Sequence, residues 1–249
     1  MGSNLTKVLI CPDVHLPYHH KQSWDTFLEV ARKWKPDKLV ILGDMVDFDE
    51  VSAHPKDPTK RIPFDEEVRK SNVEMDRLSK IYIPEVYFCE GNHETRLLRY
   101  LGDRAPELAG VVNVRQLLQI RDRGWKWVSY GDYCTIGKLH FTHDVGFSGE
   151  NAAKQSVMAF GGNIIIGHTH RAVGHYVSTI NGDRHVGWTL GWLGSAESIS
   201  YRHKARVARE SQHGFGIAYV RKSDGAAWVN FVPIIKGTAC VEGKFYNSK

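Results

Sequence analysis

The sequence predicts an α/β fold in which two packed β-sheets are flanked by helices. Two observations carry this prediction. The first half of the chain alternates short apolar runs with stretches whose apolar residues recur at helical spacing, which is typical of successive β-α units. The second half consists mostly of short strand-like runs separated by tight turns. No internal repeat or low-complexity linker divides the chain, so a single domain over residues 1–249 is the simplest organisation.

The elements of the first half can be assigned in order. Its apolar runs predict strands at 8–11, 38–42 and 86–89, and its helical spacing predicts helices at 22–34, 64–80, 94–101 and 111–121. Pro36 ends the first helix, because proline disfavours helical backbone at the residue before it. A polar stretch containing Pro55, Pro58 and Pro63 is predicted to be a loop.

The second half is predicted to be mainly β. Strands are expected at 126–130, 133–136, 139–142, 163–166, 173–179, 184–190, 215–221 and 226–232, with one helix at 150–160. The segment 195–212 is polar and lacks a clear period, and we interpret it as a lid or substrate-facing loop.

The composition is typical of an ordinary globular protein. Apolar residues make up 42% of the chain and charged residues 24%, so a core of normal size needs no disulfide or structural metal. Cys11, Cys89, Cys134 and Cys240 form no CxxC pair, which favours free thiols in a reducing cytoplasm.

Charge and hydropathy give expectations about partners and location. The net charge of +5 favours an anionic substrate slightly but does not establish nucleic-acid binding. The chain has no apolar window long enough for a transmembrane helix and no secretory signal pattern at its beginning. We therefore expect a cytoplasmic protein without a membrane partner.

Five strand-like runs end in residues that can bind metal ions. The clusters are Asp13-Val14-His15, Gly43-Asp44-Met45-Val46-Asp47, Gly91-Asn92-His93-Glu94, His143-Asp144 and Gly167-His168-Thr169-His170. Because ligands gather outside the carboxyl ends of strands in α/β sheets, these clusters can converge on one site. Nitrogen and oxygen donors without thiolates suit catalytic divalent metals better than a structural zinc site.

The spacing within the clusters predicts local geometry. Residues two apart, such as Asp13 and His15, point the same way if the chain stays extended. The glycines before Asp44, Asn92 and His168 permit sharp turns that aim the next ligand.

The order Asp-x-His, Gly-Asp-x-x-Asp, Gly-Asn-His-Glu, a lone His and Gly-His-x-His resembles the signature of the calcineurin-like metallophosphoesterases. This resemblance spans residues 13–170 and implies a four-layer α-β-β-α sandwich with two mixed β-sheets. It also implies two divalent metal ions, with manganese as the first choice and iron, zinc, nickel or cobalt as alternatives. By this resemblance, one ion would be held by Asp13, His15 and His170, the other by Asn92, His143 and His168, and Asp44 would bridge them.

The resemblance also implies roles for residues that do not bind metal. His93 would face the substrate as general acid and electrostatic clamp. Asp47 would pair with His93, which would fix the imidazole and favour its charged form. Asp49 remains an alternative to Asp47, and His140 an alternative to His143 as the lone histidine. Glu94 is expected to cap or orient the helix that begins there.

Two departures from the family pattern bear on the substrate. The protein-phosphatase branch has an arginine after the second Asp of Gly-Asp-x-x-Asp and another before Gly-Asn-His-Glu, where this chain has Phe48 and Glu90. A phosphoprotein phosphatase is therefore disfavoured, and the chain looks more like the small stand-alone bacterial or phage members. Arg96 and Arg99 either supply another phosphate contact or lie on a solvated helix face.

The resemblance implies hydrolysis by a hydroxide that bridges two cations about 3.5–4 Å apart. We expect a phosphodiesterase acting on nucleotide or nucleic-acid phosphodiesters. The alternative enzyme is a phosphomonoesterase acting on a nucleotide or another small molecule. The alternative of a different class is a metal-binding scaffold without catalysis.

Overall fold

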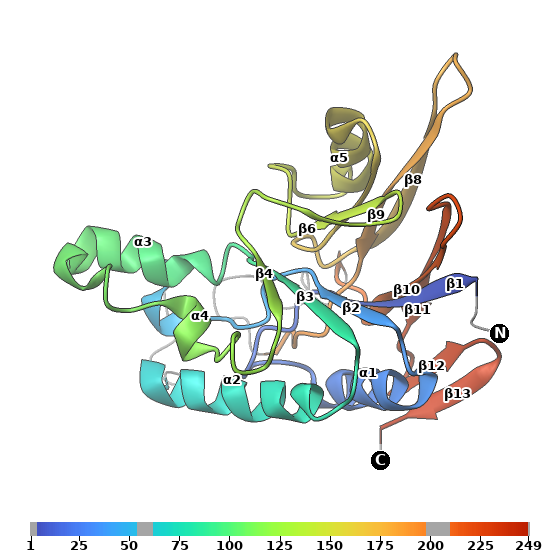
Figure 1. The fold of residues 1–249 in the computed structure, drawn as a ribbon. Coiled ribbons are helices and arrows are strands. Elements are labelled where there is room, and N and C mark those ends of the chain that lie inside the picture. Colours follow the sequence, from blue (N-terminus) through green and yellow to red (C-terminus); the bar gives the residue numbers. More distant parts are fainter. Residues whose placement is uncertain (1–3, 54–61, 198–209, 249) are drawn as a thin grey trace.

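The computed structural model describes residues 4–53, 62–197 and 210–248. Helices α1 (Lys21–Trp34) and α2 (Phe64–Ser79) cover the outer face of one sheet, and α5 (Ala152–Phe160) covers the outer face of the other (Figure 1). The two sheets pack against each other between these helices. The predicted four-layer α-β-β-α sandwich is confirmed.

The first sheet contains strands from both ends of the chain. Its order is β11-β10-β1-β2-β3-β4, with bounds β1 (Leu5–Cys11), β2 (Lys38–Ile41), β3 (Glu85–Cys89), β4 (Lys126–Val128), β10 (Gly214–Arg221) and β11 (Ala227–Pro233). β1 to β4 run parallel, whereas β10 pairs antiparallel with both β1 and β11. The carboxyl ends of β1, β2 and β3 therefore open at one edge.

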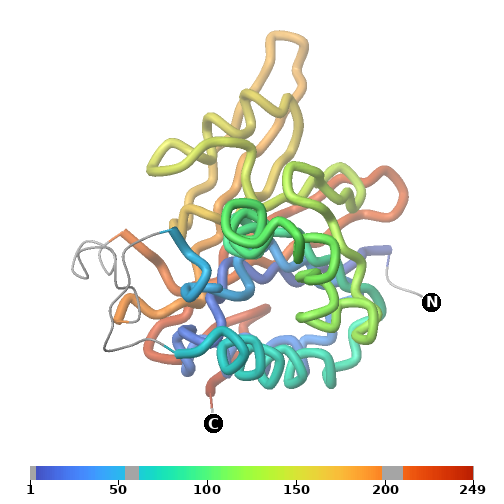
Figure 2. The backbone as a smooth tube through the Cα atoms, turned by 90° about the vertical axis from the view of Figure 1, so that its left-hand side faces the viewer, coloured from blue at the N-terminus to red at the C-terminus, as the bar shows by residue number. Residues whose placement is uncertain are grey.

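The second sheet is also mixed. Its order is β5-β6-β7-β9-β8, with bounds β5 (Cys134–Ile136), β6 (Leu139–Thr142), β7 (Asn163–Ile166), β8 (Ala172–Ser178) and β9 (Arg184–Leu190). β6, β7 and β9 are parallel, and β5 and β8 are antiparallel to their neighbours. The β8–β9 hairpin extends away from the rest of the molecule in two perpendicular views (Figures 1 and 2).

Side-chain alternation along the strands builds three apolar layers. Leu9 of β1 packs in the core beside α1 and α2, while the adjacent Ile10 packs between the sheets. On β7, Ile165 packs between the sheets and Ile166 packs in the core beside α5. Successive side chains of a strand point to opposite faces, so strands covered on both faces need continuous apolar runs. These runs explain why the strands were predictable.

Several boundaries differ from the predictions. α3 (Thr95–Arg104) begins and ends later than predicted, and the predicted helix 111–121 contains only the short α4 (Val114–Leu117). Single 3-10 turns lie at Asp49–Val51 and Pro106–Leu108. The proline-rich loop and the segment 195–212 fall largely outside the described residues.

A C-terminal hairpin was not predicted. Its strands are β12 (Thr238–Val241) and β13 (Lys244–Asn247), which pair antiparallel and contact α1. Val241 and Tyr246 are buried in the core beside that helix. In the described part of the chain, no helix combines the length and hydrophobicity that a membrane crossing requires.

Candidate metal centre

The five clusters meet where five strands end. Asp13 follows β1, Asp44 follows β2 and Asn92 follows β3 in the first sheet; His143 follows β6 and His168 follows β7 in the second. Each of these side chains is buried or half-buried. Residues from both sheets thus form one site across the interface between them.

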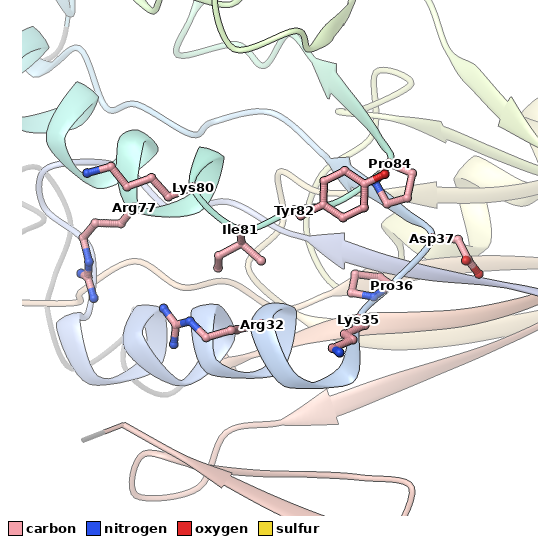
Figure 3. Close-up of a pocket in the computed structure, with 9 residues that line it drawn as sticks. All are labelled: Arg32, Lys35, Pro36, Asp37, Arg77, Lys80, Ile81, Tyr82 and Pro84. Carbon is pink, nitrogen blue, oxygen red and sulfur yellow. The ribbon is translucent and has the colours of Figure 1, made fainter.

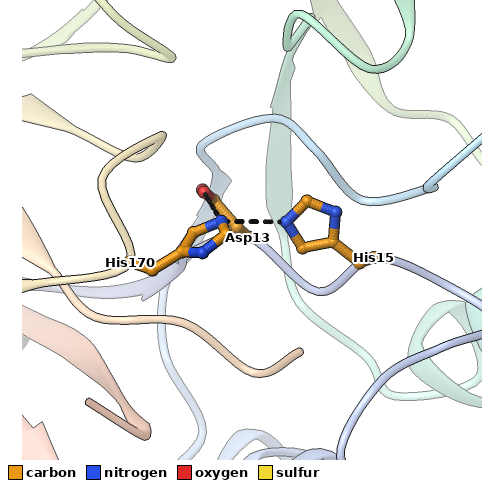
Figure 4. A group of neighbouring side chains, drawn as sticks. All are labelled: Asp13, His15 and His170. Atoms are coloured by element: carbon orange, nitrogen blue, oxygen red, sulfur yellow. Dashed lines mark hydrogen bonds and ion pairs between the residues drawn. The ribbon is translucent and has the colours of Figure 1, made fainter. Parts of the chain in front are cut away.

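The first group of donor atoms comes from Asp13, His15 and His170, shown in Figure 4. The Nε2 atoms of His15 and His170 lie 3.0 Å apart, and His170 Nε2 lies 3.2 Å from Asp13 Oδ2. Among the described residues, this buried carboxylate oxygen has no hydrogen-bond donor of suitable geometry. Two imidazole nitrogens and an unsatisfied carboxylate oxygen at one point form a donor set that fits a divalent cation.

The second group surrounds Asn92. Its Oδ1 lies 2.9 Å from His143 Nε2 and 2.8 Å from His168 Nδ1. The other ring nitrogen of His143 lies 2.8 Å from the backbone oxygen of Leu42, to which it can donate. Such a hydrogen bond leaves Nε2 as the lone-pair nitrogen and orients it, as is common for metal-binding histidines.

Asp44 lies between the two groups. Its Oδ1 is 3.5 Å from His143 Nε2, and its carboxylate also clusters with ring nitrogens of His15 and His93. This is the position that a bridging carboxylate requires. The ligand roles themselves stay predictions, while the predicted convergence of these side chains is found.

The buried carboxylates attract positive charge. Burial disfavours the charged form of Asp44, yet His143, His93 and His15 hold its pKa well below the usual range. Although burial also disfavours a charged imidazole, Asp44 and Asp13 raise the pKa of His143 to about 9. Because ligand nitrogens must be deprotonated, a bound cation would replace this proton.

His93 and Asp47 form the predicted pair. His93 Nδ1 lies 2.9 Å from both the Oδ1 atom and the backbone oxygen of Asp47. The same Oδ1 atom lies 3.0 Å from His15 Nδ1, so Asp47 orients two histidines, which was not predicted.

Asp47 favours the charged form of His93, as predicted, but the pKa of His93 is nevertheless lowered on balance. Burial lowers the pKa of His93, and nearby His15 acts in the same direction. Together these effects outweigh the opposing carboxylates of Asp44 and Asp47.

The structure also decides between the alternatives. His140 Nδ1 lies 3.0 Å from Thr135 Oγ1, and its ring packs on Phe160, so His143 is the histidine at the site. Asp47 is the carboxylate that contacts His93, whereas the backbone N–H of Asp49 donates to Glu67.

The extended chain that would make Asp13 and His15 point the same way is not found at the site. His15, Asp44, His168 and His170 have φ values of 58°, 46°, 66° and 59°. This left-handed region is unfavourable for residues with a Cβ atom and persists only where surrounding contacts impose it. The candidate ligands therefore converge through left-handed turns.

The cluster glycines act in two ways. Gly43 has φ +93° and makes the predicted sharp turn. A Cβ atom on Gly91 would lie 2.3 Å from Asp44 Oδ1, and one on Gly167 would lie 2.4 Å from Asp13 Oδ1. These two glycines make room for the buried carboxylates.

Comparison with known proteins agrees with this geometry. The sequence model of the calcineurin-like phosphoesterases matches residues 6–220, a span that includes all five clusters. The chain belongs to the calcineurin-like phosphoesterase family. Membership of this family supports metal-dependent phosphoester hydrolysis in general.

Full-length relatives occur in phages. The Gene 54 protein of Mycobacterium phage L5 is 25% identical and aligns over 96% of this chain and 98% of its own length. The Gene 54 protein of Mycobacterium phage D29 is 26% identical and aligns over 95% of this chain and 97% of its own length. The solved structure of Vacuolar Protein Sorting 29 from Cryptosporidium parvum aligns over 98% of each chain with a TM-score of 0.50 and 13% identity, which shows a shared fold.

In this calcineurin-like phosphoesterase, Glu94 has a different role from the one predicted. It caps no amide of α3. Its buried carboxylate instead accepts backbone hydrogen bonds from Gly91 (2.8 Å), Asp44 (2.9 Å), Met45 (2.9 Å) and Val46 (3.1 Å). Burial and nearby Asp44 raise the pKa of Glu94 to about 7, against the effect of these hydrogen bonds. Glu94 therefore ties the Asp44 turn to the Asn92 turn.

Trp192 is a second supporting residue that the sequence did not reveal. It is almost fully buried and stacks on the ring of His170 at 4.5 Å. It also meets the ring of His15 edge-on at 6.1 Å. Trp192 therefore packs behind two candidate ligands, and nothing in its local sequence marks it.

Glu67 of α2 is buried beside the loop that carries Asp47. Its Oε1 accepts a 3.0 Å hydrogen bond from the backbone of Asp49, while Oε2 has no hydrogen-bond partner among the described residues. Burial, together with Asp47, raises the pKa of Glu67 to about 8.

We expect Glu67→Gln to change how stability depends on pH. The folded pKa lies above the unfolded value of 4.5, so the protonated carboxyl stabilises the fold at low pH and this contribution is lost as pH rises toward 8. Each pH unit in that window removes up to about 1.4 kcal/mol, and glutamine removes this dependence. Urea unfolding of the chelated protein should show similar stability near pH 5 and a more stable variant at pH 8. Glu66→Gln, at a half-buried neighbouring carboxylate, is the control. Parallel pH profiles for Glu67→Gln and wild type would contradict the burial argument.

A separate cavity of about 720 Å³ lies between the carboxyl-terminal parts of α1 and α2 and the segments that follow them (Figure 3). Its basic residues are Arg32, Lys35, Arg77 and Lys80. Arg32 pairs with Glu29 and Arg77 with Asp25, while Lys35 and Lys80 are helix C-cap residues that complement the terminal carbonyls. We therefore assign no substrate to this cavity.

Proposed function

We propose that the protein is a divalent-metal-dependent phosphodiesterase acting on nucleotide or nucleic-acid phosphodiesters. One observation carries the proposal. Donor atoms from five strand ends gather in two groups around Asp44, and His93 lies beside that carboxylate with its Nε2 atom 3.6 Å from Asp44 Oδ2. Such an arrangement combines cation binding with a titratable group next to it.

The donor set fits two metal ions, with Mn²⁺ as the first candidate. Asp13, His15 and His170 would hold one ion, Asn92, His143 and His168 the other, and Asp44 would contact both. A bound pair of such ions activates water and offsets the charge of the phosphate. Nitrogen and oxygen ligands without a thiolate support manganese, iron, zinc, nickel or cobalt.

His93 would supply the proton that the leaving group takes up. Asp47 holds its Nδ1 atom, so Nε2 is the nitrogen that can face a substrate. A protonated Nε2 would donate to the leaving alkoxide, and general acid catalysis of this kind contributes about 10²–10⁴-fold to the rate.

The charge at the site supports a diester. Phe48, which is fully buried, and Glu90 stand where the protein-phosphatase branch has arginines. A phosphomonoester carries about −1.5 to −2 charges at pH 7, whereas a diester carries one. The absence of arginine at positions 48 and 90 therefore favours the substrate with less charge.

The diesterase proposal predicts which synthetic ester the Mn²⁺-loaded protein cleaves. Bis-p-nitrophenyl phosphate should be hydrolysed with release of one equivalent of p-nitrophenol, because the monoester product is a poor substrate. Chelated protein is the control. Cleavage of p-nitrophenyl phosphate alone would contradict the diesterase assignment, and cleavage of neither ester with any of the five metals would favour the scaffold alternative.

A panel of single- and double-stranded DNA and RNA then tests the substrate class. We expect Mn²⁺-dependent cleavage of at least one of them or of a nucleotide diester. Resistance of all these substrates, with bis-p-nitrophenyl phosphate still cleaved, would assign another class of diester.

A further inference from the structure

Arg96 is a buried cation at the edge of the candidate metal centre. It lies in the first turn of α3, three residues after His93, and only 8% of its surface is exposed. Its Nη1 atom donates a 2.7 Å hydrogen bond to the backbone oxygen of Asp47, and its Nη2 atom lies 2.7 Å from His93 Nε2. The solvated helix face considered from the sequence is therefore wrong for Arg96, whereas Arg99 is exposed.

Within residues 4–53, 62–197 and 210–248, the guanidinium group has no close carboxylate to itself. Asp47 Oδ1 lies 3.8 Å from Nη1, and the same oxygen already contacts both His15 and His93. A buried charge without a close, unshared partner is costly. An anion bound beside His93 would complete the pairing.

The contact between Arg96 and His93 assigns the hydrogen-bonding roles. A guanidinium group has only donors, so His93 Nε2 must be the acceptor and Nδ1 carries the hydrogen toward Asp47. The atom that a substrate would approach is therefore covered by an arginine N–H group in the structure.

Position 48 offers no cation for this task. Phe48 is fully buried and has φ 52°, and its ring lies 5.2 Å from that of Phe64. The loop after Asp47 thus turns an aromatic side chain into the core. Arg96, from α3, instead contacts Asp47 and His93.

We propose that Arg96 binds a phosphoryl oxygen of the substrate beside His93, and that its move onto this oxygen uncovers His93 Nε2. The proposal rests on phosphoester binding at the metal centre, and it names the residue that contacts the phosphate. Arginine suits this role because its planar, permanently charged donors match phosphate oxygens.

Phosphate binding tests this proposal without relying on turnover. Inorganic phosphate is titrated calorimetrically into Mn²⁺-loaded wild type, Arg96→Gln and Arg96→Lys, after the metal content of each has been measured. We expect Arg96→Gln to weaken phosphate binding about 10- to 100-fold, the size of a lost charged hydrogen bond, and Arg96→Lys to restore part of it. The matched control is Arg104→Gln, an exposed arginine at the end of the same helix, which should bind as wild type does.

Two results would overturn the proposal. Wild-type phosphate affinity in Arg96→Gln would show that the guanidinium does not contact the anion. Loss of Mn²⁺ from both Arg96 variants would show that Arg96 supports the Asp47 loop instead. Neither result bears on the diesterase assignment, which the ester assays of the wild type test. Failure of the Arg96 proposal can therefore be distinguished from failure of the diesterase proposal.

A kinetic measurement distinguishes an Arg96 that contacts the substrate from an Arg96 that only positions His93. If the wild type cleaves bis-p-nitrophenyl phosphate, Arg96→Gln should raise KM by about the factor lost in phosphate affinity, and Arg96→Lys should recover part of it. A fall in kcat with unchanged KM and unchanged phosphate affinity would instead make Arg96 a residue that positions His93.

Discussion

His93→Ala should retain both Mn²⁺ ions and lose about 10²–10⁴-fold in kcat on bis-p-nitrophenyl phosphate. The imidazole is a titratable side chain beside Asp44 to which we assign no ligand role. Asp47 holds its Nδ1 atom, and Nε2 lies near Asp44 and Arg96. Metal content measured by mass spectrometry and steady-state kinetics under saturating Mn²⁺ would check both halves of the prediction.

A second variant guards against a simple packing defect. His93→Asn keeps a side-chain N–H group that can reach the backbone oxygen of Asp47, so the loop contact survives while the titratable nitrogen is removed. It should be as inactive as His93→Ala. His140→Asn is the control, because this histidine lies at the Thr135 contact outside the candidate ligand groups. Unchanged turnover in both His93 variants would refute the assigned role, and loss of metal would make His93 a ligand.

Glu94→Ala should destabilise the metal-free protein by roughly 3–5 kcal/mol and abolish tight Mn²⁺ binding. The substitution leaves four backbone N–H groups, those of Gly91, Asp44, Met45 and Val46, without their buried acceptor. Each buried donor left unsatisfied costs about 1–3 kcal/mol, and relaxation or entering water recovers part of the sum. The same loss frees the turn that positions Asp44.

The measurement is urea unfolding of chelated protein together with a Mn²⁺ titration. Glu90→Ala is a matched control on the same connection. Glu90 is only half-buried and, in the part of the chain that the structure describes, accepts a single backbone hydrogen bond, from Tyr130 at 3.0 Å. It should cost about 1 kcal/mol or less. Equal destabilisation by the two substitutions would contradict the clamp that we assign to Glu94.

Much of the fold could be predicted from local pattern. Strands such as β1, β2 and β7 are buried on both faces, so they require uninterrupted apolar runs that are visible in the sequence. The β12–β13 hairpin was missed because it is short and only one of its faces packs, against α1. α4 was predicted too long because its apolar residues are shared with turns that precede and follow a single helical turn.

The residue types of the site could also be predicted from the sequence, because the candidate ligands and the glycines before them lie in short motifs at strand ends. The sequence alone determined which carboxylates, imidazoles and amide belong together. Only the tertiary structure decided how they are held. His15 and His170 are 155 positions apart, and their 3.0 Å contact depends on the packing of one sheet against the other.

The tertiary structure likewise decided the supporting residues. The local sequence does not show whether Glu94 caps a helix or binds the Asp44 turn. It also does not show whether Arg96 is buried or lies on a solvent-exposed helix face. Which of these applies depends on the direction of α3 relative to the Asp44 turn, and on the burial that follows from it. Motifs specify the donor atoms, whereas burial and long-range packing set their backbone conformation, their hydrogen-bond partners and their charge.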